Sequence, residues 1–137
     1  MREWTEVADA VAQTRSTSAK VGTVASYLRA LPPTDLQDAV VFLSGRPFPE
    51  RDPRTTGLGW VAIARAAEEV AGPTSGGLGA AYDRSSDLGT AVGDLLGSAG
   101  HRPHGGGPGV AEVRATFDAI ADARGPAAKS DLLRRLL

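Results

Sequence analysis

The chain has 137 residues, the size of one domain, and 42% of them are hydrophobic, which is enough for a core. It has no cysteine, which excludes a disulfide framework and a thiolate metal site. The net charge of −1 argues weakly against a nucleic-acid partner, but the distribution of charge matters more than its sum.

Composition also predicts the kind of core and the compartment. Only 5% of the residues are aromatic, so the core should consist of Ala, Val and Leu in closely packed helices. No apolar run reaches the length of a membrane span and no signal peptide opens the chain, so we expect a cytoplasmic protein with no membrane partner. Residues 61–100 carry two basic and five acidic groups, whereas residues 101–137 carry six basic and four acidic groups.

Helical spacing of apolar residues predicts three helices before residue 44. The first has Trp4, Val7, Ala8 and Val11 on one face and should end near Ser16. Thr17 or Ser18 should cap the second, which ends at Pro32-Pro33 and has an apolar stripe of Val21, Val24, Ala25, Leu28 and Leu31. A capping box at residues 34–37 should open the third, with the inward residues Leu36, Ala39, Val40 and Leu43.

The stretch from Leu43 to Trp60 contains three prolines and three arginines, Arg46, Arg51 and Arg54. Gly45 stands where a helix C-terminus needs positive φ, and the prolines keep the loop extended. Thr55, Thr56 and Gly57 precede the next predicted helix, whose unpaired N–H groups attract anions. A stiff loop with three guanidinium groups suits a phosphate backbone. The alternative is a solvated surface loop in which Glu50 and Asp52 pair with the arginines.

The rest of the chain predicts four or five further short helices. They cover Leu58 to Ala71, Leu78 to Arg84, a segment capped by Asp87, a segment from Val110 to Ala121, and Ala127 to Leu137. A glycine-rich loop with His101 and His104 spans residues 97–109, and Gly125-Pro126 separates the last two helices. No segment alternates like a strand. We predict an all-α bundle of about seven or eight short helices.

The two ends of the chain resemble each other without a gap. When residues 3–28 are aligned with residues 112–137, eight of the 26 pairs are identical, including Lys20 with Lys129. Each copy is a helix, a short break and a second helix with lysine in its first turn. We therefore predict a pseudo-twofold repeat whose two helix starts hold two phosphate strands of one duplex. The alternative is coincidence in an alanine-rich chain.

Several segments resemble, in the same order, the N-terminal DNA-binding domain of bacterial and archaeal ATP-dependent DNA ligases. Residues 43–51 match L-S-G-R-x-F-P-x-R, and residues 56–60 match T-G-x-G-W. Residues 18–21 resemble the S-x-K-[IV] helix start of this family. Residues 86–89 resemble its G-D-[LV]-G turn, with Ser86 in place of glycine. The segment from Gly109 to Lys129 is similar to its closing motif. The resemblance spans most of the chain, which we treat as one domain, residues 1–137.

This resemblance implies an all-helical domain that binds nicked duplex DNA across the minor groove, without base specificity, in DNA replication, recombination and repair. Such binding rests on phosphates and sugars. The predicted DNA-binding residues are Ser18, Lys20, Arg46, Arg51, Arg54, Thr55, Thr56, Gly57, Gly59, Gly125, Ala127 and Lys129. The implied partners are the adenylylation and OB domains of the same ligase, expected after residue 137. The chain itself should be a monomer.

The residues of ligase chemistry are absent from the sequence. The family uses a lysine in Lys-x-Asp-Gly, and Lys129-Ser130-Asp131-Leu132 lacks the glycine and falls in a predicted helix. We therefore expect no catalytic residue and no cofactor in this chain, with ATP and Mg²⁺ used by the downstream catalytic domain. His101 and His104 have neither cysteine nor an acidic residue beside them, so we expect no metal site.

Two other functions remain open on the sequence alone. One is a helical protein-interaction module without DNA binding, with the alanine-rich face of residues 61–71 as its docking groove. The other is a small independent enzyme, for which only scattered carboxylates such as Glu68 and Glu69 could be cited, and these are typical of a solvated face.

Overall fold

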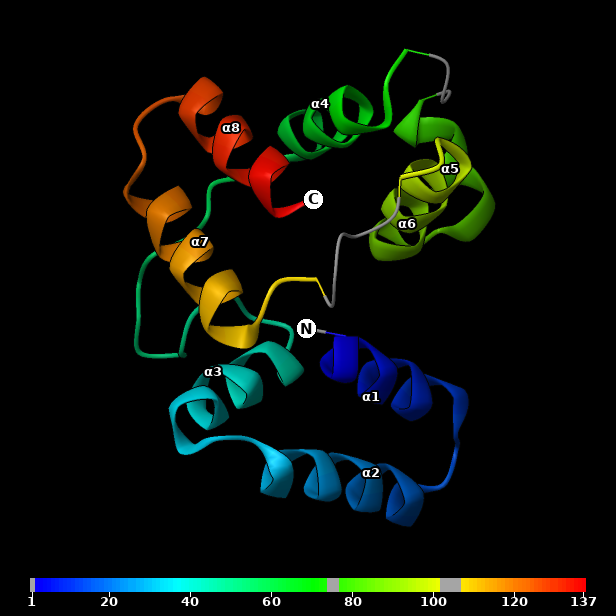
Figure 1. Cartoon of the computed structure of the whole chain (residues 1–137), viewed down its shortest axis with the longest axis vertical. Coiled ribbons are helices and arrows are strands. Elements are labelled where there is room, and N and C mark those ends of the chain that lie inside the picture. Colours follow the sequence, from blue (N-terminus) through cyan, green and yellow to red (C-terminus); the bar gives the residue numbers. More distant parts are fainter. Residues whose placement is uncertain (1, 74–76, 102–106) are drawn as a thin grey trace. The chain divides into compact units, whose positions relative to one another are not determined.

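The structure is a computed structural model that describes residues 2–73, 77–101 and 107–137. These residues form eight helices and no strand, which confirms the all-α prediction (Figure 1). The helices are α1 (Arg2–Gln13), α2 (Thr17–Ala30), α3 (Pro33–Leu43), α4 (Trp60–Ala71), α5 (Leu78–Ser85), α6 (Leu88–Ser98), α7 (Val110–Asp122) and α8 (Pro126–Leu136). None of these helices has both the length and the apolar character needed to cross a membrane.

Helix ends follow local capping chemistry, and two of the predicted caps are wrong. Ser16, not Thr17 or Ser18, caps α2, because its hydroxyl accepts the N–H of Ala19. The predicted capping box at residues 34–37 does not form, because α3 already begins at Pro33 and no side chain caps it. Asp87 caps α6 as predicted, accepting the N–H of Thr90 at 2.7 Å.

The chain forms two compact units. Unit 1 contains Met1–Thr55 and Gly106–Phe117, and unit 2 contains Thr56–Gly105 and Asp118–Leu137. Helix α7 contributes its first part to unit 1 and its last part to unit 2. The predicted DNA-binding residues are thereby divided, since those up to Thr55 belong to unit 1 and those from Thr56 onward belong to unit 2.

The core of unit 1 is built around aromatic residues. In this unit α1 packs on α2 and α2 packs on α3. The ring of Phe42 meets that of Phe117 edge-on, with 5.6 Å between the centroids. This contact selects the face of α3 that is buried, so Ala39 and Phe42 lie inside. The prediction for Leu36 and Val40 is therefore wrong, because both are exposed, and so is that for Val21 on α2.

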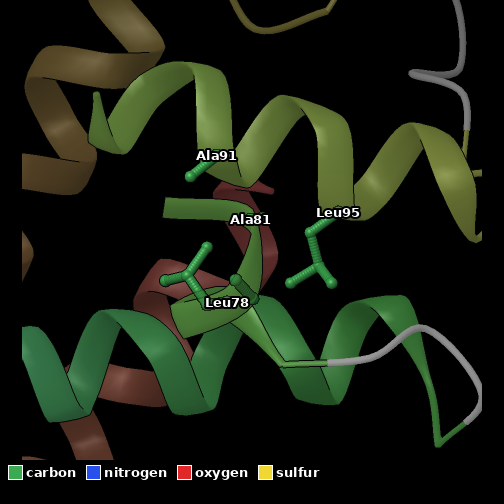
Figure 2. Packing of buried hydrophobic residues seen from close by; sticks show 5 residues of the cluster. Leu78, Ala81, Ala91 and Leu95 are labelled. Atoms are coloured by element: carbon green, nitrogen blue, oxygen red, sulfur yellow. The ribbon is translucent and has the colours of Figure 1, made fainter. Parts of the chain in front are cut away.

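Unit 2 has the alanine- and leucine-based core that the composition predicts. Helix α4 packs on α8, α6 and α5, and α5 packs on α6. Figure 2 shows Leu78 and Ala81 of α5 and Ala91 and Leu95 of α6 gathered in one cluster, which Ala67 of α4 completes. A neighbouring cluster joins Ala66, Ile120 and Leu133. Alanine lets helix backbones approach closely, so a small unit buries its apolar surface without large side chains.

Helix boundaries recur in the register of the sequence repeat. Helix α1 ends at Gln13 and α2 begins at Thr17, while α7 ends at Asp122 and α8 begins at Pro126, so both boundaries are 109 residues apart. The packing differs, because α1 packs on α2, whereas α8 packs chiefly on α4. Burial differs too, since Val11 is half-buried and its counterpart Ile120 is fully buried. The repeat is thus shared local structure placed in two different tertiary settings.

Candidate nucleic-acid interface

The start of α2 presents polar and basic groups to solvent. Ser18 is exposed, and its hydroxyl lies 3.0 Å from that of Ser16. Lys20 is half-buried, and its N–H bonds the carbonyl of Ser16, so it sits in the first turn of the helix. A lysine there opposes the helix dipole, which favours anions at the N-terminus. Helix stability alone therefore does not account for Lys20, whose charge adds to the positive end of the helix dipole.

The arginine loop, defined here as residues 44–55, connects α3 to the residues before α4. Gly45 turns the chain out of α3 at φ +75°, as predicted. Arg46 lies 3.7 Å from Glu50, with both side chains largely exposed, so the pair contributes little. Arg51 is exposed, and no ion pair of Arg51 is found in the described part of the chain. Of the three guanidinium groups of the loop, that of Arg51 is the most available to a phosphate.

Arg54 forms several hydrogen bonds with the carboxylate of Asp52. Its Nη2 donates to Asp52 Oδ2 at 2.7 Å, its Nε lies 3.1 Å from both carboxylate oxygens, and its backbone N–H donates to Oδ1 at 3.0 Å. These bonds to Arg54 lower the pKa of Asp52 from 3.8 to about 2. The alternative that the acidic residues pair with the arginines is thus confirmed for two of the three. A paired Arg54 still carries donors in a fixed orientation.

Phe48 anchors the arginine loop, a role that the sequence analysis missed. Its side chain is only 3% exposed. The guanidinium carbon of Arg54 lies 4.8 Å from the ring centroid, and that of Arg114 on α7 lies 5.3 Å from it. Arg114 also pairs with Asp38 of α3 at 3.3 Å. An aromatic residue between prolines in a polar loop was the available sequence indication for Phe48, whereas nothing local marks Arg114.

In unit 2, the glycine turn, defined here as residues 56–59, is tied to α8 by Lys129. The ammonium group of Lys129 donates to the carbonyl oxygen of Thr56 at 2.7 Å. Gly57 follows at φ +61°, and a Cβ there would come within 2.9 Å of Lys129 Nζ. Glycine suits this position because it adopts the left-handed conformation without strain and leaves the ammonium group of Lys129 in place. Lys129 thus holds the turn with one donor and keeps two others available.

Helix α4 begins later than predicted, at Trp60, with Gly59 as its cap. Thr55 and Thr56 therefore precede the helix by several residues outside regular secondary structure, and they do not lie at its first turn. The hydroxyl of Thr56 instead accepts the N–H of Leu58 at 3.5 Å. Gly59 is the predicted residue that lies where the unpaired N–H groups of the helix point outward.

The start of α8 resembles that of α2 in charge but not in its cap. Gly125 has φ +84° and no side chain to accept an N–H, and Pro126 occupies the first helical position. Ala127 and Gly125 are exposed. The structure thus joins Thr56, Gly57 and Lys129 in unit 2, and in unit 1 it gathers Arg46, Arg51 and Arg54 on one loop and Ser18 and Lys20 on α2.

The two histidines of the glycine-rich loop, His101 and His104, were considered as metal ligands in the sequence. The Nε2 atom of His101 lies 3.3 Å from the carbonyl oxygen of Leu137, and His104 lies outside the described residues. In the described part of the chain, no three His, Cys, Asp or Glu side chains gather as a metal site would require.

The alternative prediction, that the alanine-rich face of residues 61–71 is a docking groove, is wrong. Ala66 and Ala67 are fully buried against the other helices of unit 2, so this face is already covered. The carboxylates proposed for an enzyme are also engaged. Glu68 accepts the N–H of Leu78 at 2.8 Å and so caps α5 from a distance. Glu69 pairs with Arg65 at 2.8 Å and with Arg134 at 2.9 Å.

Comparison with known proteins shows similarity to the N-terminal part of DNA ligases. The family model described as "DNA ligase N terminus" matches residues 1–137. A probable DNA ligase of Opitutus terrae is 38% identical over 95% of this chain and 16% of its own length. Another of Koribacter versatilis is 35% identical over 96% of this chain and 23% of its own length. A DNA ligase of Methanopyrus kandleri is 29% identical over 89% of the chain and 22% of its own length. No solved structure matches significantly. The chain spans less than a quarter of these relatives.

Proposed function

Because the chain belongs to the family of DNA ligase N-terminal domains, we propose that it binds nicked duplex DNA without sequence specificity. The match of the family model to the whole chain carries this proposal. Three features of the described residues support it. They are Lys20 in the first turn of α2, the exposed Arg51, and the turn at Gly57 where Lys129 keeps spare donors. All three suit phosphate oxygens, which carry no base information.

The complete protein would be an ATP-dependent DNA ligase that acts in replication, recombination and repair. In this proposal the chain is the DNA-binding part and works as a monomer in the cytoplasm, beside the adenylylation and OB domains. ATP and Mg²⁺ would be bound by the adenylylation domain. The residues of this chain would hold the duplex across the minor groove so that the nick stays in register with that domain.

The dependence of binding on salt tests the proposal. The 137-residue chain and a nicked duplex are titrated at several salt concentrations, and log K is plotted against log salt. Lys20→Ala and Lys129→Ala should each weaken binding to every duplex sequence and flatten the slope by about 0.9. The double variant should flatten it by about 1.8 units, since each phosphate contact releases its own counterions.

Arg65→Ala is the matched control for this titration. It removes one positive charge from an exposed residue of α4 that is already paired with Glu69, so the slope should change less. Shuffled duplexes of equal length should bind the wild type within about 1–3 kcal/mol of one another, the value of one good base contact. Failure of the wild type to bind duplex DNA at low salt would refute the proposed function.

A further inference from the structure

The arginine loop is anchored by a residue that lies far from it in the sequence. Arg114 of α7 stacks over Phe48 at 5.3 Å, within the distance at which a guanidinium group is attracted to the face of a ring. Its Nη1 bonds Asp38 Oδ1 at 3.3 Å, and its side chain is 18% exposed. Arg114 therefore connects three segments of unit 1, namely α7, α3 and the loop.

The contacts of Phe48 make it the point through which this anchor acts. Arg54 approaches the same ring at 4.8 Å, and Asp52 binds Arg54 through its side chain and its backbone. Release of Phe48 would thus remove the ring that both Arg54 and Arg114 contact. In sequence, Arg51 stands between Phe48 and Asp52, so the backbone from which its exposed side chain extends is held on both sides.

Charge alone does not require arginine at position 114. Lysine would keep the ion pair with Asp38 but not the planar group that stacks on Phe48, since the lysine ammonium is a compact and strongly hydrated charge. Both side chains of the pair are mostly covered, so loss of Arg114 would take the ion pair away from a carboxylate that solvent reaches poorly.

We propose that Arg114 is a positioning residue for DNA binding, which acts through Phe48 to hold Arg51 and Arg54 in the geometry that meets phosphates. This inference rests on the proposed function. It assigns to Arg114 no contact with DNA, and it explains why an aromatic residue stands among the prolines and arginines of the loop.

The test compares Arg114→Lys with Arg114→Gln, and Arg29→Gln serves as the matched control because it removes a charge from an exposed residue of the same unit. Both Arg114 variants should lose affinity for nicked duplex by roughly tenfold, the scale of a cation–π contact. Both should also speed amide hydrogen exchange in residues 44–55. Arg29→Gln should leave exchange in the loop unchanged. Asp38→Asn, which keeps the arginine, is the second variant should the others unfold.

The decisive comparison repeats Arg114→Lys in a chain that also carries Arg51→Gln and Arg54→Gln. A positioning residue has little left to position there, so affinity should fall less than twofold further, as expected for coupled sites. An equal loss in both backgrounds would overturn the proposal, because Arg114 would then act independently of the loop. Full binding by Arg114→Lys with a flattened salt slope only in Arg114→Gln would also overturn it. If the wild type fails to bind duplex, exchange in the loop still reports whether Arg114 anchors Phe48.

Discussion

At the scale of single residues, the positions with the strictest requirements are glycines and their neighbours. Gly57 and Gly45 both have positive φ, but only Gly57 faces another group where a Cβ would stand. Lys129 is that group, and it already bonds Thr56. Lys129 therefore has a structural task beside its proposed contact with phosphate, and the two can be separated by measurement.

Gly57→Ala should destabilise the chain more than Gly45→Ala does. Both substitutions add left-handed strain of about 1–2 kcal/mol, and only the first also displaces the ammonium group of Lys129 from the Thr56 carbonyl. The free energy of unfolding from denaturant titration measures both. In a Lys129→Ala background the two substitutions should cost nearly the same. A persistent difference there would show that the ammonium is not the cause.

At the scale of elements, helix ends and loops are stabilised by short-range polar contacts. The end of α5 is unusual because Ser86 takes φ +53°, the only described residue other than glycine with positive φ. The neighbouring Ser85 hydroxyl accepts the N–H of Asp87 at 3.3 Å, and this bond spans the turn at Ser86.

Ser86→Gly should stabilise the chain by about 0.5–1 kcal/mol, since glycine removes the strain but loses more backbone entropy on folding. Thermal unfolding followed by circular dichroism would register a higher midpoint. Ser85→Ala is the matched control and should lower the midpoint, because it removes the hydroxyl bonds to Ala81 and Asp87. An unchanged or lower midpoint for Ser86→Gly would contradict the argument.

The arginine loop should respond to acid through Asp52. Its pKa is lowered to about 2, so the stabilisation from its pairing with Arg54 is present above about pH 4 and disappears as the pH falls through 2. Carboxyl carbon shifts measured by NMR should show a midpoint near pH 2 for this residue.

Arg54→Gln should return the midpoint of Asp52 toward 3.8, because the bonds to Arg54 are the largest cause of the shift. Arg46→Gln should leave it in place, because Arg46 pairs with Glu50 instead. A wild-type midpoint at 3.8 would mean that Asp52 and Arg54 are not paired in solution.

At the scale of the whole molecule, the chain offers groups for binding and none that we assign to catalysis. Lys129 and Asp131 stand on α8, where Lys129 bonds Thr56 and Asp131 pairs with Arg134. Neither belongs to a Lys-x-Asp-Gly motif, because Leu132 follows Asp131. We propose that this chain contributes to ligation by binding the duplex.

We expect the chain alone to form no covalent adduct with AMP. Incubation with labelled ATP and Mg²⁺, followed by denaturing electrophoresis, measures this directly. A ligase relative with its catalytic domain is the positive control. Label retained on any lysine of this chain, and lost in the corresponding lysine variant, would contradict its assignment as a DNA-binding part.

The sequence by itself determined the helices, because their determinants are local. Apolar spacing, the Asp87 cap, Gly45 and Gly125-Pro126 act within a few residues, and the register of the repeat correctly marks both breaks. Local rules misplaced the cap of α2, where three adjacent hydroxyl residues, Ser16, Thr17 and Ser18, compete for one position.

Tertiary structure decided which face of α3 is buried and which basic groups are bound. On α3, Phe42 is buried and Leu36 is exposed, because the ring of Phe42 packs against that of Phe117 on α7, 75 residues away. Lys129 reaches Thr56 across 73 residues, and Arg114 reaches Asp38 across 76. Such contacts depend on how helices pack, and a pattern of nearby residues carries no information about them. The sequence therefore predicts the helices and identifies the basic residues. The fold decides which of the basic residues make structural contacts.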